Sequence, residues 1–315
     1  MKKNIATLSL CLVGLLTTVV YAIGLGNGLF FDDARLTDGT IYGGTYGGLL
    51  DFKQRMLSYG SFVWVNVLVP DNIAAQRVVN LTLHLGTAAV LYGLFGRLLQ
   101  TIDRRDPQNA SELSPALQAG LIVGTAWFSL APVAVYGVGY LIQRSIVMAT
   151  LFSALACYAW VRGLQERRPA WLLAATASYV LAVLSKEQSF LLASLSVPLY
   201  VFVTRPTWQR VALVAGCAGL ALGAALSVLL VVYPHLLGQV FDDTSRQLVA
   251  QLEQQRPGIT AQIYPLSVLN QATLFFYYGF LWLVPVVGWM SIDMRPPFPL
   301  GFDSVPHLAG AAAYV

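Results

Sequence analysis

The chain has 315 residues, of which 57% are hydrophobic and only 11% charged, and its formal net charge is +4. Soluble domains carry about a quarter charged residues, so this chain has too few charges to cover a water-soluble surface. It contains repeated apolar runs of the length needed to cross the hydrocarbon core, and it shows no strand-like alternation. The composition therefore predicts an all-α integral membrane protein whose helices satisfy their own backbone groups.

Eight apolar stretches are predicted to form membrane segments. The first follows Lys2 and Lys3 and is expected to be an uncleaved anchor, with a cleaved signal peptide as the alternative. Another apolar run, 308–315, begins where the chain stops, so we expect eight or more segments in one transmembrane domain, 1–315, that is either incomplete or ends in a short tail. The eight stretches are 4–25, 76–100, 115–130, 142–161, 171–184, 190–203, 211–233 and 269–289.

Basic residues are densest in the short connectors that share a side with the N-terminus, which places that side in the cytoplasm. Two long loops then share the outer face, at 26–75 and 234–267. Loops of this length tend to be functional, and we expect them to carry short helices. Within the first loop, 61–70 is apolar but too short to span, so it is expected to lie along the membrane surface or dip into it.

An acidic pair, Asp32 and Asp33, follows the first apolar stretch directly. Adjacent carboxylates repel each other, and partial burial raises the pKa of at least one, which suits a general base or a cation ligand. The alternative is a solvated start of the loop.

Cations and amides near other segment ends are further candidates. Gln143 and Arg144 open the fourth segment, where the arginine either holds a phosphate or anchors at the interface. Lys186 and Glu187 separate two short segments as an internal ion pair or a phosphate contact. His84 lies one turn after Asn80, either as a packing residue or as part of a site.

Other functional classes lack their signals. The three cysteines fall inside apolar stretches, as packing residues do, and no zinc spacing or Gly-rich nucleotide loop is present. Asp293 follows the last apolar stretch and is a weak candidate by itself.

The order of these features resembles the GT-C membrane glycosyltransferases, closest to the transmembrane-and-TPR O-mannosyltransferases and their bacterial relatives. The resemblance runs from about Gly28 to Asp293. It departs from the family at Ala131-Pro132, where the family usually has His-Pro, and it lacks the TPR region. The matching features are the acidic pair after Phe30-Phe31, Arg55-x-x-Ser58, Asn80-x-x-x-His84, Gln143-Arg144, Ser185-Lys186-Glu187, Asn270-Gln271 and Asp293.

This resemblance implies a GT-C-like helical bundle that transfers a sugar, with inversion, from a polyprenyl-phosphate carrier to an acceptor hydroxyl of a protein, glycan or lipid. Asp32 or Asp33 would be the base, and Arg144, Lys186 and Arg55 would hold the donor phosphate. The supporting residues would be Glu187, Gln143, His84 and Asp293. No metal ligand is assigned. Members of the family differ in their need for a metal, so a divalent cation stays an open possibility.

Two other functions remain as alternatives. A lipid-linked-sugar flippase or other transporter also needs charges within the membrane, although no internal repeat is seen. A non-catalytic scaffold would leave the charged set unexplained. We expect membrane lipid but no nucleic acid among the partners. The preferred location is a bacterial inner membrane, with the active site facing the periplasm, although an endoplasmic reticulum protein would show similar spans.

Overall fold

A computed structural model describes residues 2–43, 46, 53, 55–103, 113–232, 243–291 and 297–314. Within these residues every regular element is a helix and no strand occurs, which confirms the all-α prediction. The chain divides into two compact units, Met1–Val232 and Tyr233–Val315. The expected single transmembrane domain stays a prediction.

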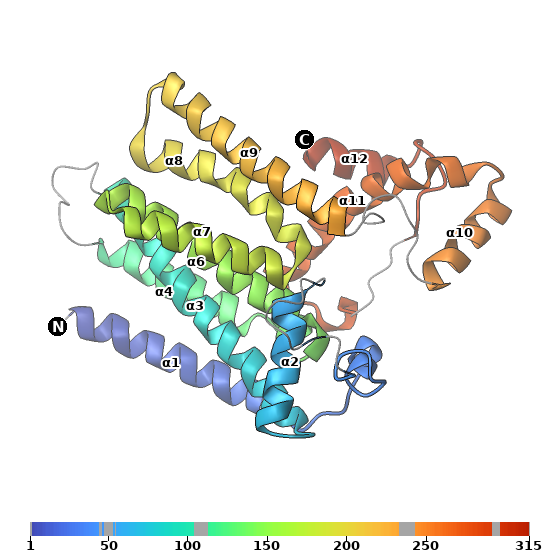
Figure 1. Cartoon of the computed structure of the whole chain (residues 1–315), viewed down its shortest axis with the longest axis horizontal. Helices are drawn as coiled ribbons and strands as arrows, with labels where there is room; N and C mark the ends of the chain where they lie inside the picture. The colour runs from blue at the N-terminus through green and yellow to red at the C-terminus, as the bar shows by residue number, and fades with distance from the viewer. Residues whose placement is uncertain are drawn as a thin grey trace. The chain divides into compact units, whose positions relative to one another are not determined.

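The first unit is a bundle of long helices. Figure 1 shows α1, α3, α4, α6 and α7 running side by side, and α6 packs against both α3 and α7. Next to α7, α9 packs on η4 and α8. The elements of this unit are α1 (Lys2–Ala22), η1 (Phe31–Leu36), α2 (Met56–Leu68), α3 (Ile73–Asp103), α4 (Pro115–Leu130), η2 (Pro132–Ala134), α5 (Val135–Val138), η3 (Leu141–Gln143), α6 (Arg144–Glu166), α7 (Pro169–Ser185), η4 (Glu187–Leu195), α8 (Ser196–Thr204) and α9 (Trp208–Val232).

Several of these helices could cross a membrane. Each of the eight predicted apolar stretches coincides with helix, at least over most of its length. Among the described residues, four helices are long and apolar enough to span, and a fifth does so if α4 and the bent segment after it count as one. The structure therefore supports an integral membrane protein, while eight or more spans stay a prediction. The four helices are Ile73–Ile102, Leu141–Glu166, Glu187–Thr204 and Trp208–Val231.

Local sequence explains where these helices begin and end. Ser114 caps α4, its hydroxyl accepting from the backbone N–H of Leu117 at 3.4 Å, and Pro115 opens the helix. Arg205 ends α8 in a left-handed conformation, with φ 46°, directly before Pro206. The chain after α4 bends by 45° at Pro132, which has no N–H to continue the backbone ladder.

The segment 26–75, predicted as a loop, contains two short helices among its described residues. One is η1, which carries the acidic pair, and the other is α2. The first half of α2 is buried in protein, whereas Val67 and Leu68 near its end are 74% and 80% exposed. Asn66 then accepts from the backbone N–H of Asp71 at 3.0 Å and turns the chain into α3.

The second unit is smaller, and every regular element in its described part is a helix. Its elements are α10 (Asp243–Gln255), η5 (Ile259–Gln262), α11 (Ile263–Leu283), η6 (Val287–Trp289) and α12 (Val305–Tyr314). Leu252, Ile259, Leu266 and Leu269 form its buried core. The predicted loop 234–267 therefore contains α10, η5 and the first turn of α11.

Candidate functional site

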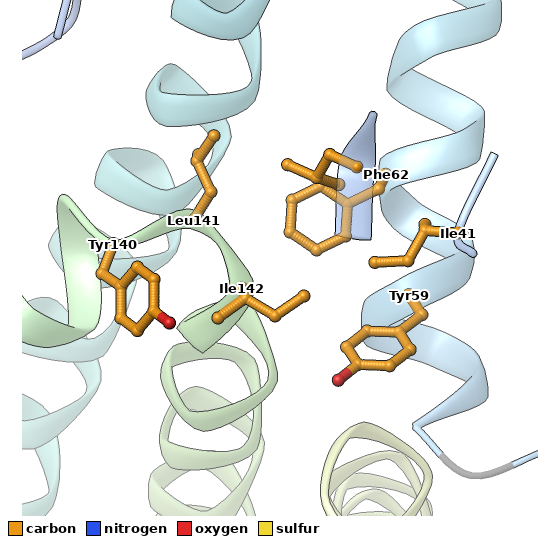
Figure 2. Packing of buried hydrophobic residues seen from close by; sticks show 7 residues of the cluster. Ile41, Tyr59, Phe62, Tyr140, Leu141 and Ile142 are labelled. Atoms are coloured by element: carbon orange, nitrogen blue, oxygen red, sulfur yellow. The ribbon is translucent and has the colours of Figure 1, made fainter. Parts of the chain in front are cut away.

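A buried cluster at one end of the first unit organises the candidate residues. Figure 2 shows Ile41 after η1 and Tyr59 and Phe62 of α2 facing Tyr140 and Ile142 from the turn before α6. Leu36 and Leu141 complete the cluster. Burial of these apolar side chains holds the acidic turn, α2 and the start of α6 together.

Asp33 is fully buried and anchors the acidic turn. Its carboxylate accepts from the backbone N–H of Ile142 at 2.9 Å and, more weakly, from that of Phe30 at 3.5 Å. Burial raises the pKa of Asp33, and these hydrogen bonds partly offset the rise. Because the carboxylate is buried and already accepts a hydrogen bond from the turn before α6, it is poorly placed to reach a substrate.

Asp32 is arranged differently from its neighbour. Its side chain is 62% exposed, and the nearest cation is Arg35 at 4.0 Å. Its backbone N–H donates to the hydroxyl of Tyr140 at 3.0 Å. Asp32 thus presents an accessible carboxylate on a backbone that the protein holds in place.

Arg77, at the start of α3, holds the chain just before this turn, and the sequence did not single it out. Its guanidinium donates to the carbonyls of Leu25, Asn27 and Gly28, and at 3.5 Å to that of Gly139. Arg77 as a whole residue is 4% exposed. The only signal in the sequence was a charged residue within the first turns of a predicted span.

Arg55 and Glu187 form the second charged group of the site. Two guanidinium nitrogens of Arg55 donate to the two carboxylate oxygens of Glu187, at 2.8 and 3.2 Å. A third nitrogen donates to the hydroxyl of Tyr59 at 2.9 Å. Burial alone would lower the pKa of Arg55, but the hydrogen bonds and charge of its partners outweigh burial and raise it.

Two motifs that lie far apart in the sequence, Arg55-x-x-Ser58 and Ser185-Lys186-Glu187, contact each other in the structure. Ser58 of the Arg55-x-x-Ser58 segment donates to the carbonyl of Ser185 at 2.9 Å, beside the Arg55–Glu187 ion pair. These contacts join the start of α2 to the end of α7, so the separate sequence signals belong to one structural unit.

Lys186 lies in the chain between Ser185, which accepts from Ser58, and Glu187, which pairs with Arg55. It is half-buried, and within the described part of the chain its ammonium makes no hydrogen bond or ion pair. Burial lowers the pKa of Lys186, and the positive charge of Arg55 lowers it further, while Glu187 acts in the opposite direction. A half-buried ammonium with free donors is suited to an external anion.

Arg144 is fully buried, and the protein itself occupies most of its donors. It donates to Asn80 at 2.7 Å, to Ser61 at 3.2 Å, and to the carbonyl and side chain of Gln76 at 2.7 and 2.8 Å. Its guanidinium carbon lies 3.7 Å from the ring centre of Phe62. A guanidinium has five N–H donors, so little of this group is left for a phosphate.

The remaining predicted residues are more peripheral. Gln143 is half-buried and directly precedes α6. His84 is buried, its Nε2 lies 3.0 Å from the carbonyl of Ser129, and its ring packs against Tyr21 and Phe128. Asp293 lies outside the described residues.

The acidic turn and the cationic group share their surroundings. Tyr59 packs in the buried cluster with Tyr140 and also accepts from Arg55. Tyr46 packs against the same cluster, and the charges of Arg55 and Arg35 both act on its hydroxyl. Asp32 is therefore linked to this cluster through Tyr140, and the Arg55–Glu187 pair beside Lys186 is linked to it through Tyr59.

Metal binding finds no support in the part of the chain that the structure describes. There, no group of three or more His, Cys, Asp or Glu side chains is placed to hold an ion. Asp51 and Asp293 fall outside that part.

Comparison with known proteins gave no match. No family model matches the chain, and no curated protein or solved structure reached significance.

Proposed function

We propose that this chain is a GT-C-type membrane glycosyltransferase, which moves a sugar from a polyprenyl-phosphate carrier to an acceptor hydroxyl on the periplasmic or lumenal face. One observation carries the proposal: the backbone of the accessible Asp32 is held by Tyr140 of the buried cluster, and the half-buried Lys186, which has no partner among the described residues, directly precedes Glu187, whose partner Arg55 donates to Tyr59 of the same cluster. The reaction needs a base and a fixed cation in this kind of arrangement.

The proposed site lies at one end of the helical bundle. Its hydrogen bonds involve the chain just after α1, the first turns of α3 and α6, the last residue of α7 and Glu187 just after it. Segments that alternate in direction bring these ends together. A site at the ends of apolar helices suits a donor whose prenyl chain stays in the bilayer while its sugar phosphate reaches water.

The proposed mechanism assigns one step to each charged group. Asp32 takes the proton from the acceptor hydroxyl as that oxygen attacks the anomeric carbon. The bond between the anomeric carbon and the phosphate oxygen breaks, and the polyprenyl phosphate leaves with the bonding electrons. Attack opposite the leaving group inverts the anomeric carbon. Lys186 stabilises the negative charge that grows on the phosphate.

The other charged residues take supporting roles in this proposal. Arg55 and Glu187 form the ion pair that fixes the backbone beside Lys186. Asp33 and Arg144 hold the scaffold, because the contacts of both are already made within the protein. Of the two adjacent aspartates, we therefore propose Asp32 as the base.

A transfer assay tests the proposal. Membranes containing the full chain are supplied with a labelled polyprenyl-phosphate sugar, and label in the protein, glycan and lipid fractions is counted separately. The parent should label an acceptor, and Asp32→Asn should slow transfer by about 100-fold or more, as expected for loss of a general base. Asp38→Asn, which changes an exposed aspartate in the same loop, is the matched control and should keep the parent rate.

The same assay separates the transporter alternative. A parent that moves the labelled carrier between leaflets without labelling an acceptor would support a flippase and contradict transfer. Full transfer by Asp32→Asn would remove Asp32 from the mechanism.

A further inference from the structure

The turn between α5 and α6 holds both residues of the acidic pair. The hydroxyl of Tyr140 accepts the backbone N–H of Asp32 at 3.0 Å, and the backbone N–H of Ile142 donates to the carboxylate of Asp33 at 2.9 Å. Two adjacent residues are thus fixed by a second segment more than a hundred positions along the chain. Such a two-point attachment leaves the backbone at Asp32 little freedom to rotate.

The Tyr140 ring is itself held firmly. It is 8% exposed. It belongs to the buried cluster drawn in Figure 2. Its carbonyl accepts from the N–H of Gln143 at 3.2 Å, which closes the short η3 turn. Because the ring is packed and its backbone is closed into a turn, the hydroxyl is a fixed acceptor.

The two attachments act on different parts of the turn. The bond at Asp33 is made by a side chain and secures the turn to η3. The bond at Asp32 is made by the backbone and leaves the carboxylate free, with 62% of the side chain exposed. A contact that fixes a residue's backbone while its functional group faces solvent suits preorganisation of a base.

We propose that Tyr140 is a positioning residue, whose hydroxyl orients the backbone of Asp32 so that the exposed carboxylate meets the acceptor hydroxyl. This inference rests on the proposed transferase function. Tyr140 acts through Asp32 and does not touch the reacting atoms. Its effect should therefore appear in the rate of the transfer step and not in donor binding.

The test is Tyr140→Phe in the full chain in membranes. The substitution keeps the packed ring and removes only the acceptor of one hydrogen bond. The value of kcat should fall about tenfold, the order expected for one hydrogen bond, with KM for the polyprenyl-phosphate sugar unchanged within about twofold. Tyr179→Phe is the matched control, because the Tyr179 hydroxyl donates to the carbonyl of Phe190 at 2.9 Å, away from the acidic turn. It should leave both constants at the parent values.

Amide hydrogen exchange gives a second readout that does not depend on activity. Loss of the hydroxyl should speed exchange at the N–H of Asp32 by about tenfold, and exchange at the N–H of Ile142 should change little. Parent kcat in Tyr140→Phe, or unchanged exchange at Asp32, would overturn the positioning role while leaving the transferase proposal intact. A parent without transfer, or a fully active Asp32→Asn, would overturn the proposed function and this role with it.

Discussion

Arg55 and Glu187, 132 positions apart, form a two-point ion pair in which the guanidinium meets both carboxylate oxygens at 2.8 and 3.2 Å. Both side chains are at most a quarter exposed. The pair joins the segment before α2 to the start of η4 and flanks Lys186. Lys186 is the cation that we propose to bind the donor phosphate. It therefore lies beside an ion pair whose two charges offset each other.

The stability of this pair is open to measurement. Glu187→Gln and Arg55→Gln should each lower the free energy of unfolding by about 1–3 kcal/mol, because each leaves a half-buried charge without its partner. The double variant should lose less than the sum, because the two residues are coupled. Unfolding by SDS in mixed micelles measures these values. Arg35→Gln, whose partner lies 4.0 Å away on the surface, is the control and should change little. Additive losses would show that the pair contributes nothing.

Arg144 is expected to act in stability and not in donor binding. Arg144→Lys should cost about 3 kcal/mol or more, because an ammonium cannot reproduce the forked contacts to Asn80, Ser61 and Gln76 in a buried site. SDS titration of the purified chain measures the loss. Arg205→Lys, at an exposed helix end, is the matched control and should stay within about 0.5 kcal/mol of the parent. A stable Arg144→Lys protein with a raised KM for the donor would instead support a phosphate contact.

Asp33 should make stability depend on pH. Burial raises its pKa in the folded chain above the value in the unfolded chain. As pH rises from about 4, the unfolded chain releases this proton first, so the parent loses stability until the pH passes the folded pKa. Asp33→Asn keeps an oxygen for the N–H of Ile142 and removes that ionisation. The stability difference between the two proteins should therefore change across the same window.

Thermal unfolding in neutral detergent, followed from pH 4 to pH 8, measures this difference. Asp38→Asn serves as the control, because hydrogen bonds from Thr40 lower the pKa of Asp38 below the tested range. It should follow the parent curve. Parallel curves for the parent and Asp33→Asn would contradict a raised pKa at Asp33.

Donor use should weaken at alkaline pH because of Lys186. Burial and the charge of Arg55 lower the pKa of this ammonium below the ordinary lysine value of 10.5. Only the protonated form attracts a phosphate, so kcat/KM for the donor should fall as pH rises through the lowered pKa. Lys186→Arg should remove the fall that the parent shows below pH 10.5, because arginine stays protonated. Lys53→Arg is the control and should keep the parent profile. A parent profile that stays flat up to pH 10.5 would count against a phosphate contact at Lys186.

Much of the helical framework could be predicted from the sequence, because hydropathy and helix-ending signals are local properties of the chain. Apolar runs separated by Pro115, Pro169 and Pro206 coincide with helices, as expected of an integral membrane protein. The helix α2 was only partly anticipated, since the predicted apolar stretch 61–70 misses its buried first turns. The spacing of apolar residues over 13 positions does not show which half of α2 packs against the rest of the protein.

Only the tertiary structure determines which charged side chains are buried with partners and which are left accessible. Asp32 and Asp33 are adjacent and chemically identical, yet one side chain is 62% exposed and the other is fully buried, because the N–H of Ile142 meets only the second. Similarly, Arg144 and Lys186 both stand at segment ends in the sequence. In the structure, Arg144 is enclosed by neutral acceptors, and Lys186 has no partner among the described residues. These differences depend on contacts between segments 64 to 132 positions apart, which no local pattern of the sequence encodes.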